Sequence, residues 1–372
     1  MAQIISIEAF HLSVPLGRPL RLGEMQIRDR EYVFVRLTDD AGNVGCALGH
    51  ARGAPVAEVV HRCVAPFWQN AEPQAHEAIY AKCVKANVCL GTHGLFWRAL
   101  SLVDCAFYDL QSRAAGMGLG QYLGGQSRNV PTVIVGGYPV ADETPQSLQR
   151  QMELFQEFQP LGVKIASSAD LGKDTARLRA CREVLPDATP LMIDCYWSFD
   201  SAQEVLKTAS TWTDLNMGWI EDPLAFDDYD GVRLLADGLD FPLAIGDEQS
   251  GLRAFERLLR AGVSVLRLDA TVCGGVSAFV KIAQRAAELG VPVATHIFHP
   301  LHKQLADACP SVAWLETMLP ESDIEAFHHL APDAHHWRDG RLVAADSILG
   351  AGSEWDFDAV EHFKKPQASY VS

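Results

Sequence analysis

The chain has 372 residues, of which 48% are hydrophobic and 21% charged, and its formal net charge is −16 at pH 7. This length exceeds the usual size of a single domain, so we expect one barrel-sized domain and a smaller one. The negative charge argues against nucleic acid and anionic membrane surfaces as partners. It does not exclude a small anionic molecule, because a bound cation can reverse the local field.

The nine cysteines are scattered and form no Cys-x-x-Cys pair, a pattern typical of reduced, buried thiols. The first residues alternate like a strand and lack the basic flank and long apolar run of a signal peptide. No later run is long and apolar enough to cross a bilayer. We therefore expect a soluble cytoplasmic protein.

The first part of the chain has the pattern of a small α+β domain. Strand patterns cover residues 4–14 and 31–51, and helical patterns cover residues 56–68 and 96–116. Turn-forming residues in GQYLGGQSRN place a boundary near residue 127. We therefore expect an N-terminal α+β domain over residues 1–127, with residues 340–372 packing back on it.

Beyond this boundary, strand and helix patterns alternate. Strands are predicted at residues 130–137, 162–167, 191–197, 218–223, 242–249, 265–271, 291–298 and 312–317. Eight nearly continuous apolar strands with helices between them indicate an α/β fold with a parallel barrel over residues 128–340. The active site of such a barrel lies at the carboxyl ends of its strands.

Three acidic residues end successive apolar runs. These are Asp194, Glu221 and Asp247, and each interval is about one strand plus one helix. The repeat would bring the three carboxylates to one rim, where they repel each other unless a cation lies among them. Carboxylate oxygens suit Mg²⁺, so the pattern predicts a metal-assisted enzyme. Glu248 follows Asp247 and is the alternative third ligand.

Four further polar residues also end strands of this series: Lys164, Asp269, His296 and Glu316. A single such residue is usually a cap or a satisfied loop side chain. Seven in register instead indicate a catalytic mouth that holds a cation, two possible proton carriers and several carboxylates.

Several motifs resemble the mandelate racemase subgroup of the enolase superfamily. They are WIEDP around Glu221, DATVCGG from Asp269, ATHIF around His296 and AWLE before Glu316. The segment SLVDCAFYDLQSRAAGMGLGQYLGG resembles the helix that leads from the family's capping domain into its barrel. The resemblance implies a modified TIM barrel, (β/α)7β, with an N-terminal α+β capping domain. It also implies one Mg²⁺ and removal of the proton next to a substrate carboxylate.

The resemblance suggests a role for each residue at the mouth. It favours Asp247 over Glu248 as the third metal ligand. His296 is the predicted acid or base, and Asp269 would fix its tautomer and support its protonated form. A buried histidine bonded to a nearby carbonyl is the plain alternative. Glu316, if protonated, would donate a hydrogen bond to the substrate carboxylate, and otherwise it is an exposed carboxylate at the end of a strand.

Two positions depart from the family pattern. The family commonly carries Lys-x-Lys after the second strand, whereas this chain has Lys164-Ile165-Ala166. The missing second lysine argues against a two-base racemase unless Lys164 itself reaches the α-carbon. We expect Lys164 to act as an electrostatic partner of the substrate carboxylate, with pairing to the metal carboxylates as the alternative. Tyr196 stands where relatives often have a substrate-binding Asn, and it is either a substrate contact or an aromatic wall residue.

Two segments of the first domain, RPLRLGEMQIRDREY and GHARGAP, are expected to be polar loops that close over the site. Their candidate substrate contacts are Arg21, Glu24, His50 and Arg52, each of which is otherwise an ordinary surface residue.

These observations favour a Mg²⁺-dependent dehydratase of a sugar acid. It would abstract the proton α to a carboxylate through a metal-stabilised enediolate and then expel the β-hydroxyl with His296 as the acid. The alternative is a racemase, epimerase or cycloisomerase that uses the same enolate. A catalytically inactive binding protein is a further alternative, because Ala166 stands where relatives carry lysine. The resemblance also suggests a homo-oligomer.

Overall fold

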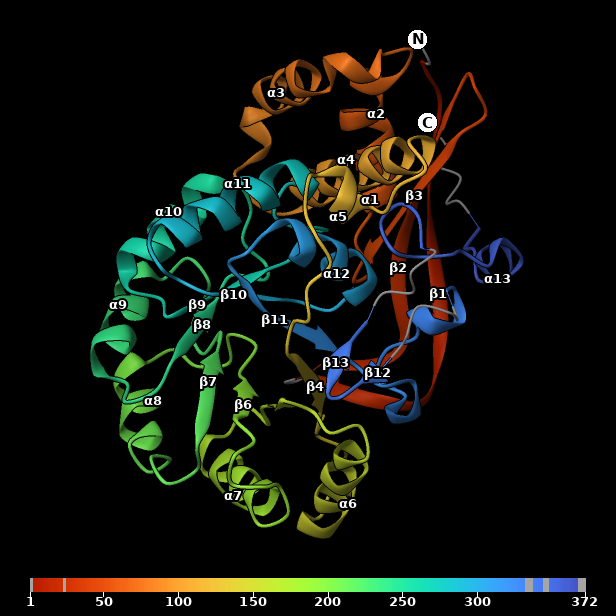
Figure 1. The fold of residues 1–372 in the computed structure, drawn as a ribbon. Coiled ribbons are helices and arrows are strands. Elements are labelled where there is room, and N and C mark those ends of the chain that lie inside the picture. The colour runs from red at the N-terminus through yellow and green to blue at the C-terminus, as the bar shows by residue number, and fades with distance from the viewer. Residues whose placement is uncertain (1–2, 23–24, 332–336, 344–347, 367–372) are drawn as a thin grey trace.

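The computed structural model describes residues 3–22, 25–331, 337–343 and 348–366. Eight parallel strands form a closed barrel, and an antiparallel three-stranded sheet lies beside it as a cap (Figure 1). The predicted fold class is therefore confirmed. The domain limits at residues 127 and 340 stay a prediction.

The capping sheet is built on one long hairpin. Its strands are β1 (Ile4–Leu22), β2 (Met25–Asp39) and β3 (Val44–His50), in the order β1-β2-β3. The segment RPLRLGEMQIRDREY was expected to be a polar loop, and this expectation is wrong for its described part. Leu20 pairs with Ile27 and Arg21 with Gln26, so both strands continue almost to the tip. Glu24 lies outside the described residues.

Helices of the capping domain follow β3. They are α1 (Val56–Val59), α2 (Ala65–Trp68), α3 (His76–Ala86), α4 (Leu95–Ala114) and α5 (Leu119–Tyr122), with a π-helical turn at Val60–Val64 and 3-10 turns at Pro73–Ala75 and Val88–Leu90. The long helix α4 packs directly on β3. A side chain at Gly45 would place its Cβ 2.2 Å from the carbonyl oxygen of Ala106, so this close contact requires glycine.

The barrel alternates strands with helices. Its strands are β4 (Thr132–Gly136), β5 (Gly162–Ala166), β6 (Leu191–Asp194), β7 (Met217–Glu221), β8 (Leu243–Ile245), β9 (Val265–Leu268), β10 (Val293–Thr295) and β11 (Val312–Thr317). The helices between them are α6 (Pro145–Gln156), α7 (Leu171–Arg182), α8 (Ala202–Ala209), α9 (Tyr229–Gly238), α10 (Leu252–Ala261), α11 (Gly275–Glu288) and α12 (His299–Ala308). Because β11 pairs directly with β4, the ring closes without an eighth helix.

Strand register brings the ends of the barrel strands level. Ala166 pairs with Asp194, Asp194 pairs with Glu221, and Thr295 pairs with Leu268. The barrel interior on the amino-terminal side is filled by Val133, Met192, Trp219, Ala244, Val265 and Ala294. The residues that follow the strands therefore meet at one mouth above a packed floor.

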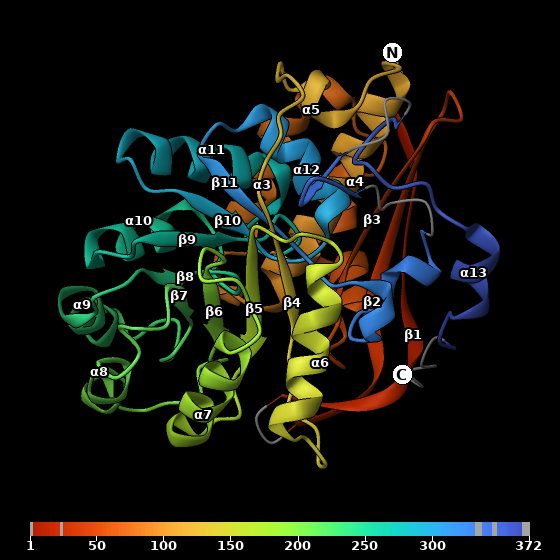
Figure 2. The ribbon, with the colours of Figure 1, turned by 60° about the horizontal axis from the view of Figure 1, so that its bottom comes forward.

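The end of the chain returns to the capping sheet. It contains 3-10 turns at Pro320–Ser322 and Phe327–His329, the short strands β12 (Trp337–Arg338) and β13 (Arg341–Leu342), and α13 (Phe357–His362). Ser13 donates its backbone N–H to Phe363, and Lys365 donates its N–H to His11. These bonds hold α13 against β1 in both ribbon views (Figures 1 and 2).

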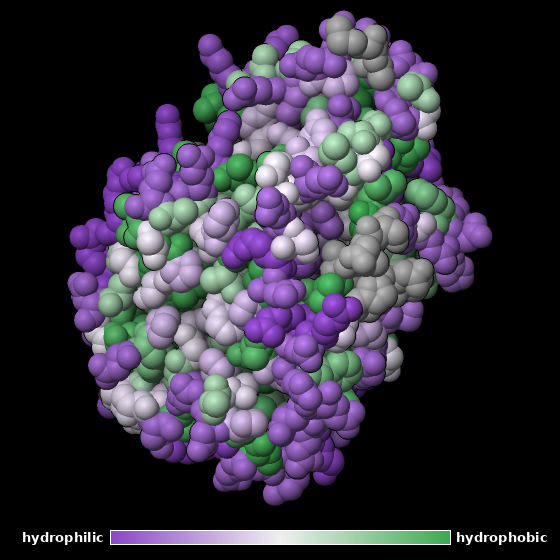
Figure 3. All heavy atoms as spheres, viewed as in Figure 1, coloured by the Kyte–Doolittle hydropathy of each residue, from purple (hydrophilic) through white to green (hydrophobic). Residues whose placement is uncertain are grey.

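The visible surface is mostly hydrophilic, with hydrophobic residues in small separate groups over the face in Figure 3. Among the described residues, no helix combines the length and apolar character needed to span a membrane.

Candidate active site

A cavity of about 470 Å³ opens between the barrel mouth and the capping sheet. The residues that line it are Gln26, Ile27, Arg28, Asp29, Arg30, Glu31, His50, Arg52, Tyr138, Tyr196, His296, Ile297 and Met318. Four of the predicted site residues are among them, namely His296, Tyr196, His50 and Arg52. A somewhat larger hollow of about 540 Å³ lies beside β1 and α1, and none of the predicted residues lines it.

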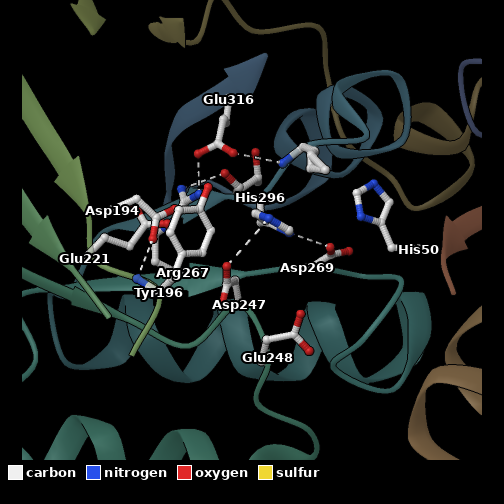
Figure 4. Close-up of polar contacts among 12 residues, drawn as sticks. His50, Asp194, Tyr196, Glu221, Asp247, Glu248, Arg267, Asp269, His296 and Glu316 are labelled. Atoms are coloured by element: carbon white, nitrogen blue, oxygen red, sulfur yellow. Dashed lines mark hydrogen bonds and ion pairs between the residues drawn. The ribbon is translucent and has the colours of Figure 1, made fainter. Parts of the chain in front are cut away.

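His296 lies between two carboxylates. Its Nδ1 is 2.9 Å from Oδ2 of Asp269, and its Nε2 is 3.5 Å from Oδ2 of Asp247 (Figure 4). The other oxygen of Asp269 accepts bonds from the N–H and the hydroxyl of Thr271, at 2.7 and 2.8 Å. Asp269 is thus fixed by Thr271 on one oxygen and by His296 on the other. This contact orients the imidazole of His296 through Nδ1, so Nε2 faces the mouth.

The pKa values of this pair move apart. Burial disfavours the ionised form of Asp269, but its hydrogen bond with His296 and the charge of His302 outweigh burial and lower its pKa. Burial opposes the imidazolium form of His296, but Asp247 and Asp269 outweigh burial and raise its pKa. The pair therefore stabilises the imidazolium that forms when His296 accepts a proton.

Lys164 is enclosed by three carboxylates. Its Nζ lies 3.0 Å from Asp194, 2.7 Å from Glu221 and 2.8 Å from Glu316, and the side chain is 1% exposed. Burial opposes its charge, but the carboxylates outweigh burial and raise its pKa. This is the alternative pairing considered from the sequence. An ammonium group held in this way is stabilised in its protonated form.

Arg267 is a buried cation that is absent from the residues predicted from the sequence. It projects from β9 into the barrel, where its Nε lies 3.0 Å from Glu221, and it also pairs with Glu316 (Figure 4). A further N–H donates to the carbonyl of Thr295 at 2.7 Å, and the guanidinium lies 5.8 Å from the ring centroid of Trp219. The only sign of it in the sequence is one charged residue inside the apolar run VLRL.

Glu316 forms ion pairs with both buried cations, Lys164 and Arg267. Burial would raise its pKa, but Arg267 and Lys164 outweigh burial and lower the pKa to about 2. Its second oxygen faces the backbone N–H of Ile297 at 3.4 Å. The expectation that a protonated Glu316 donates a hydrogen bond is therefore wrong for this arrangement, in which Glu316 is an ionised acceptor.

The tightest group of possible metal ligands is not the predicted one. Ligand atoms of Glu221, Asp222 and Asp247 lie within 4.8 Å of one another, whereas Asp194 is held by Lys164. Asp222 was not predicted, although it directly follows Glu221 in the sequence. Both of its carboxylate oxygens, and Oδ1 of Asp247, are buried without a hydrogen-bond partner among the described residues.

These unpartnered oxygens fit a hard divalent cation. Burial, followed by the charge of Asp247, raises the pKa of Asp222, and burial raises the pKa of Asp194 to about 8 despite Lys164. In both residues burial is the largest cause, and neighbouring carboxylates add to it, so a cation bound beside these oxygens would favour their ionised form. The donor set is entirely carboxylate oxygen, which is what Mg²⁺ takes from proteins. The acidic cluster is thus consistent with the predicted cofactor.

Glu248, the alternative third ligand, turns away from this cluster. It pairs with Arg52 at 2.8 Å and with Arg98. Figure 4 shows its carboxylate apart from those of Asp194 and Glu221. Two arginines already neutralise Glu248, so Asp247 is the better candidate.

The predicted substrate contacts have different surroundings. Tyr196 donates its hydroxyl to that of Tyr138 at 2.8 Å, and its φ of 48° turns the chain sharply after Asp194. His50 lies 3.1 Å from Glu325 and is set apart from the carboxylate cluster (Figure 4).

Arg21 is exposed and lines a separate hollow with Thr144 and Lys173, so its predicted place in this cavity is wrong. The error arises because Arg21 lies near the tip of the long hairpin, beyond the barrel mouth.

Comparisons with known proteins agree with this geometry. Residues 147–359 match the enolase C-terminal domain-like family, and residues 4–124 match the mandelate racemase / muconate lactonizing enzyme N-terminal domain. The chain belongs to the mandelate racemase and muconate lactonizing enzyme family. The resemblance seen in the sequence is therefore confirmed, and this member of the enolase superfamily is an enzyme.

Relatives within the family differ in their reactions. L-talarate/galactarate dehydratase of Salmonella typhimurium is 29% identical over 332 residues, which cover 89% of this chain and 81% of that protein. D-galactarolactone cycloisomerase of Agrobacterium fabrum is 27% identical over 306 residues, covering 80% and 79%. A crystal structure of the Salmonella dehydratase with Mg and L-lyxarohydroxamate superposes with a TM-score of 0.87 at 24% identity, covering 98% of this chain and 93% of that one. The family is shared, and the reaction differs among its members.

Proposed function

We propose that the protein is a Mg²⁺-dependent dehydratase of a sugar acid. The observation that carries this proposal is the presence of one well-built proton carrier at the barrel mouth. His296 is oriented by Asp269, while Lys164 is enclosed by carboxylates and Ala166 has no proton to exchange. Removal of a proton and departure of a hydroxyl on one face require a single acid–base group, whereas inversion requires one on each face.

Asp222, Asp247, Glu221 and Asp194 are the residues that would hold Mg²⁺. Glu221 and Asp247 fit both the sequence pattern and the compact cluster, and Asp222 adds two oxygens that have no other partner. When bound, Mg²⁺ would offset the second negative charge that develops on the substrate carboxylate during proton removal.

The protein side chains account for the proton movements. Neutral His296 takes the α-proton, and Asp269 stabilises the imidazolium that results. The electron pair of the broken C–H bond gives an enediolate, whose collapse breaks the C–O bond to the β-hydroxyl. His296 returns its proton to this leaving group, so water departs and the imidazole is neutral again. The enol that remains becomes an α-keto acid by moving one proton from oxygen to carbon.

A second reaction is supported by one observation. The hydrogen-bonded phenols of Tyr138 and Tyr196 line the same cavity as His296 and could supply another proton carrier. An epimerase or cycloisomerase would use such a pair to return a proton to the enolate without expelling water. The similarity to D-galactarolactone cycloisomerase agrees with this alternative.

The two reactions give different deuterium-labelled products in D₂O. We would incubate the enzyme and Mg²⁺ with a panel of sugar acids and follow the α-proton and keto-acid signals by ¹H NMR. The proposal predicts an α-keto acid that carries solvent deuterium at the adjacent carbon. Exchange or inversion of the α-proton without any keto acid would reject the dehydratase in favour of the isomerase.

A further inference from the structure

The capping sheet places one incompletely bonded cation on the wall of the active-site cavity. Arg30 lies on β2, is 7% exposed and lines the cavity. Its Nε donates to the backbone carbonyl of Ile324 at 2.7 Å, which fixes the plane of the guanidinium. Its Nη2 is buried and has no hydrogen-bond partner among the described residues. A buried guanidinium donor without an acceptor suggests that a ligand supplies one.

Two other charged groups on this wall already have ion-pair partners. Arg52 pairs with Glu248 at 2.8 Å, and Glu31 pairs with Lys365. Arg28 and Asp29 are exposed and opposite in charge. Among the described cap residues that line the cavity, Arg30 is therefore the one with a buried side-chain donor that has no acceptor.

The carboxylate that pairs with Arg30, that of Glu325, also contacts two other side chains. Glu325 lies 3.6 Å from Nε of Arg30, and it also contacts His50 at 3.1 Å and accepts the hydroxyl of Tyr32. These contacts are on the Nε side of the guanidinium. None of them provides an acceptor for Nη2, which stays buried without a hydrogen-bond partner among the described residues beside the cavity.

Tyr138 links Arg30 to the catalytic end of the cavity. Tyr138 lines the cavity together with Arg30, and its hydroxyl accepts that of Tyr196 at 2.8 Å, two residues after Asp194. Burial raises the pKa of the Tyr138 phenol, and the charge of Arg30 opposes that rise. Arg30 comes from the cap, whereas Lys164 and His296 come from the barrel. A substrate whose reacting carboxylate lies at the barrel mouth would therefore extend its far end toward Arg30.

We infer that the substrate carries a second carboxylate at its far end, which Arg30 binds. This inference rests on the proposed function and makes the substrate an aldaric acid, a sugar acid with a carboxylate at each end. A guanidinium edge matches the two oxygens of a carboxylate better than a single hydroxyl. A cavity of about 470 Å³ has room for a six-carbon diacid.

The test compares matched acids and matched variants. Six-carbon aldaric acids would be assayed beside the aldonic acids of the same configuration, which end in a hydroxyl, and beside the corresponding 6-phosphates. Arg30→Gln removes the charge, and Arg30→Lys keeps the charge but loses the planar edge. Arg36→Gln, on the same strand but outside the cavity and paired with Glu8, is the control.

We expect the wild-type enzyme to prefer the diacid, and Arg30→Gln to lower kcat/KM for it at least 100-fold, mainly through KM. The slower monoacid reaction should change by less than about threefold, Arg30→Lys should be intermediate, and Arg36→Gln should resemble the wild type. An equal loss for both acids would show a structural role and overturn the inference. A wild-type preference for the monoacid or the phosphate would also overturn it.

One further measurement covers variants that fold poorly and separates this inference from the proposed function. Non-reactive dicarboxylates should inhibit the wild-type enzyme at least tenfold more strongly than monocarboxylates of equal length, and equal inhibition would count against the second carboxylate. If diacids undergo Mg²⁺-dependent α-exchange that depends on Arg30 but give no keto acid, the dehydratase proposal fails and the role of Arg30 stands.

Discussion

Nε of Arg267 lies 3.0 Å from Oε1 of Glu221, inside the barrel and below the acidic cluster. The other oxygen of Glu221 accepts the indole N–H of Trp219 at 2.8 Å. Glu221 is therefore held by a permanent charge and by a neutral donor, and Lys164 adds a second cation. This arrangement fixes the carboxylate before any metal ion arrives, so it contributes both to the fold and to preorganisation of the site.

Removing the guanidinium should be costly. We predict that Arg267→Met lowers the free energy of unfolding by about 3–5 kcal/mol, because it leaves Glu221 and Glu316 buried with one cation fewer. Urea unfolding followed by circular dichroism measures this loss. Arg179→Gln, which breaks an exposed ion pair with Asp214, is the control and should leave the free energy of unfolding almost unchanged. Equal losses in the two variants would contradict the role given to Arg267.

Magnesium should stabilise the folded protein. At a free concentration of 100 times its Kd, we predict a gain of about 2.7 kcal/mol in the free energy of unfolding, seen as a rise in Tm. Asp247→Asn should abolish most of this gain and should also stabilise the metal-free protein, because one buried negative charge is removed from the cluster. The exposed Asp200→Asn variant should respond to Mg²⁺ like the wild type. An unchanged Mg²⁺ response in Asp247→Asn would contradict the ligand assignment.

Asp269 should act through His296. We predict that Asp269→Asn lowers kcat by about 10²-fold or more, with a smaller change in KM, because the imidazole loses its orienting partner. The carboxylate of Asp269 is one cause of the raised pKa of His296. If neutral His296 is the base, the acid limb of the kcat/KM profile should therefore move to lower pH in the variant. A profile that stays in place despite the loss of rate would point to a structural effect instead.

The strand pattern was sufficient to predict the barrel and to place its functional residues at the carboxyl ends of the strands. Asp194, Glu221 and His296 each end or follow a short apolar run. Parallel pairing makes Asp194 a neighbour of Glu221, and closure of the barrel brings His296 to the same mouth. The His296–Asp269 contact is likewise a consequence of adjacent strands β9 and β10. The periodicity of apolar residues thus predicts most of the fold and the general position of the site.

Side-chain direction was harder to predict. Glu221 and Asp222 are adjacent in the sequence, yet Glu221 is bonded on both oxygens within the barrel whereas both oxygens of Asp222 are unpartnered. Arg267 belongs to a strand that otherwise has an apolar pattern. Arg30 lies in a segment whose Pro, Gly and charged residues are typical of a loop, although cross-strand pairing with β1 keeps it extended. Tertiary partners decide these positions, and a local pattern does not contain them.

The most direct test of the account is transfer of the α-proton by His296. The wild-type enzyme and His296→Asn would be compared in D₂O by ¹H NMR, each with the best acid found in the panel and with Mg²⁺ or EDTA. We predict that the wild type removes the α-proton only with Mg²⁺, and that His296→Asn loses this activity by at least 10³-fold while its Mg²⁺-induced rise in Tm persists. Loss of the α-proton at an undiminished rate in His296→Asn, or in wild type with EDTA, would contradict the account.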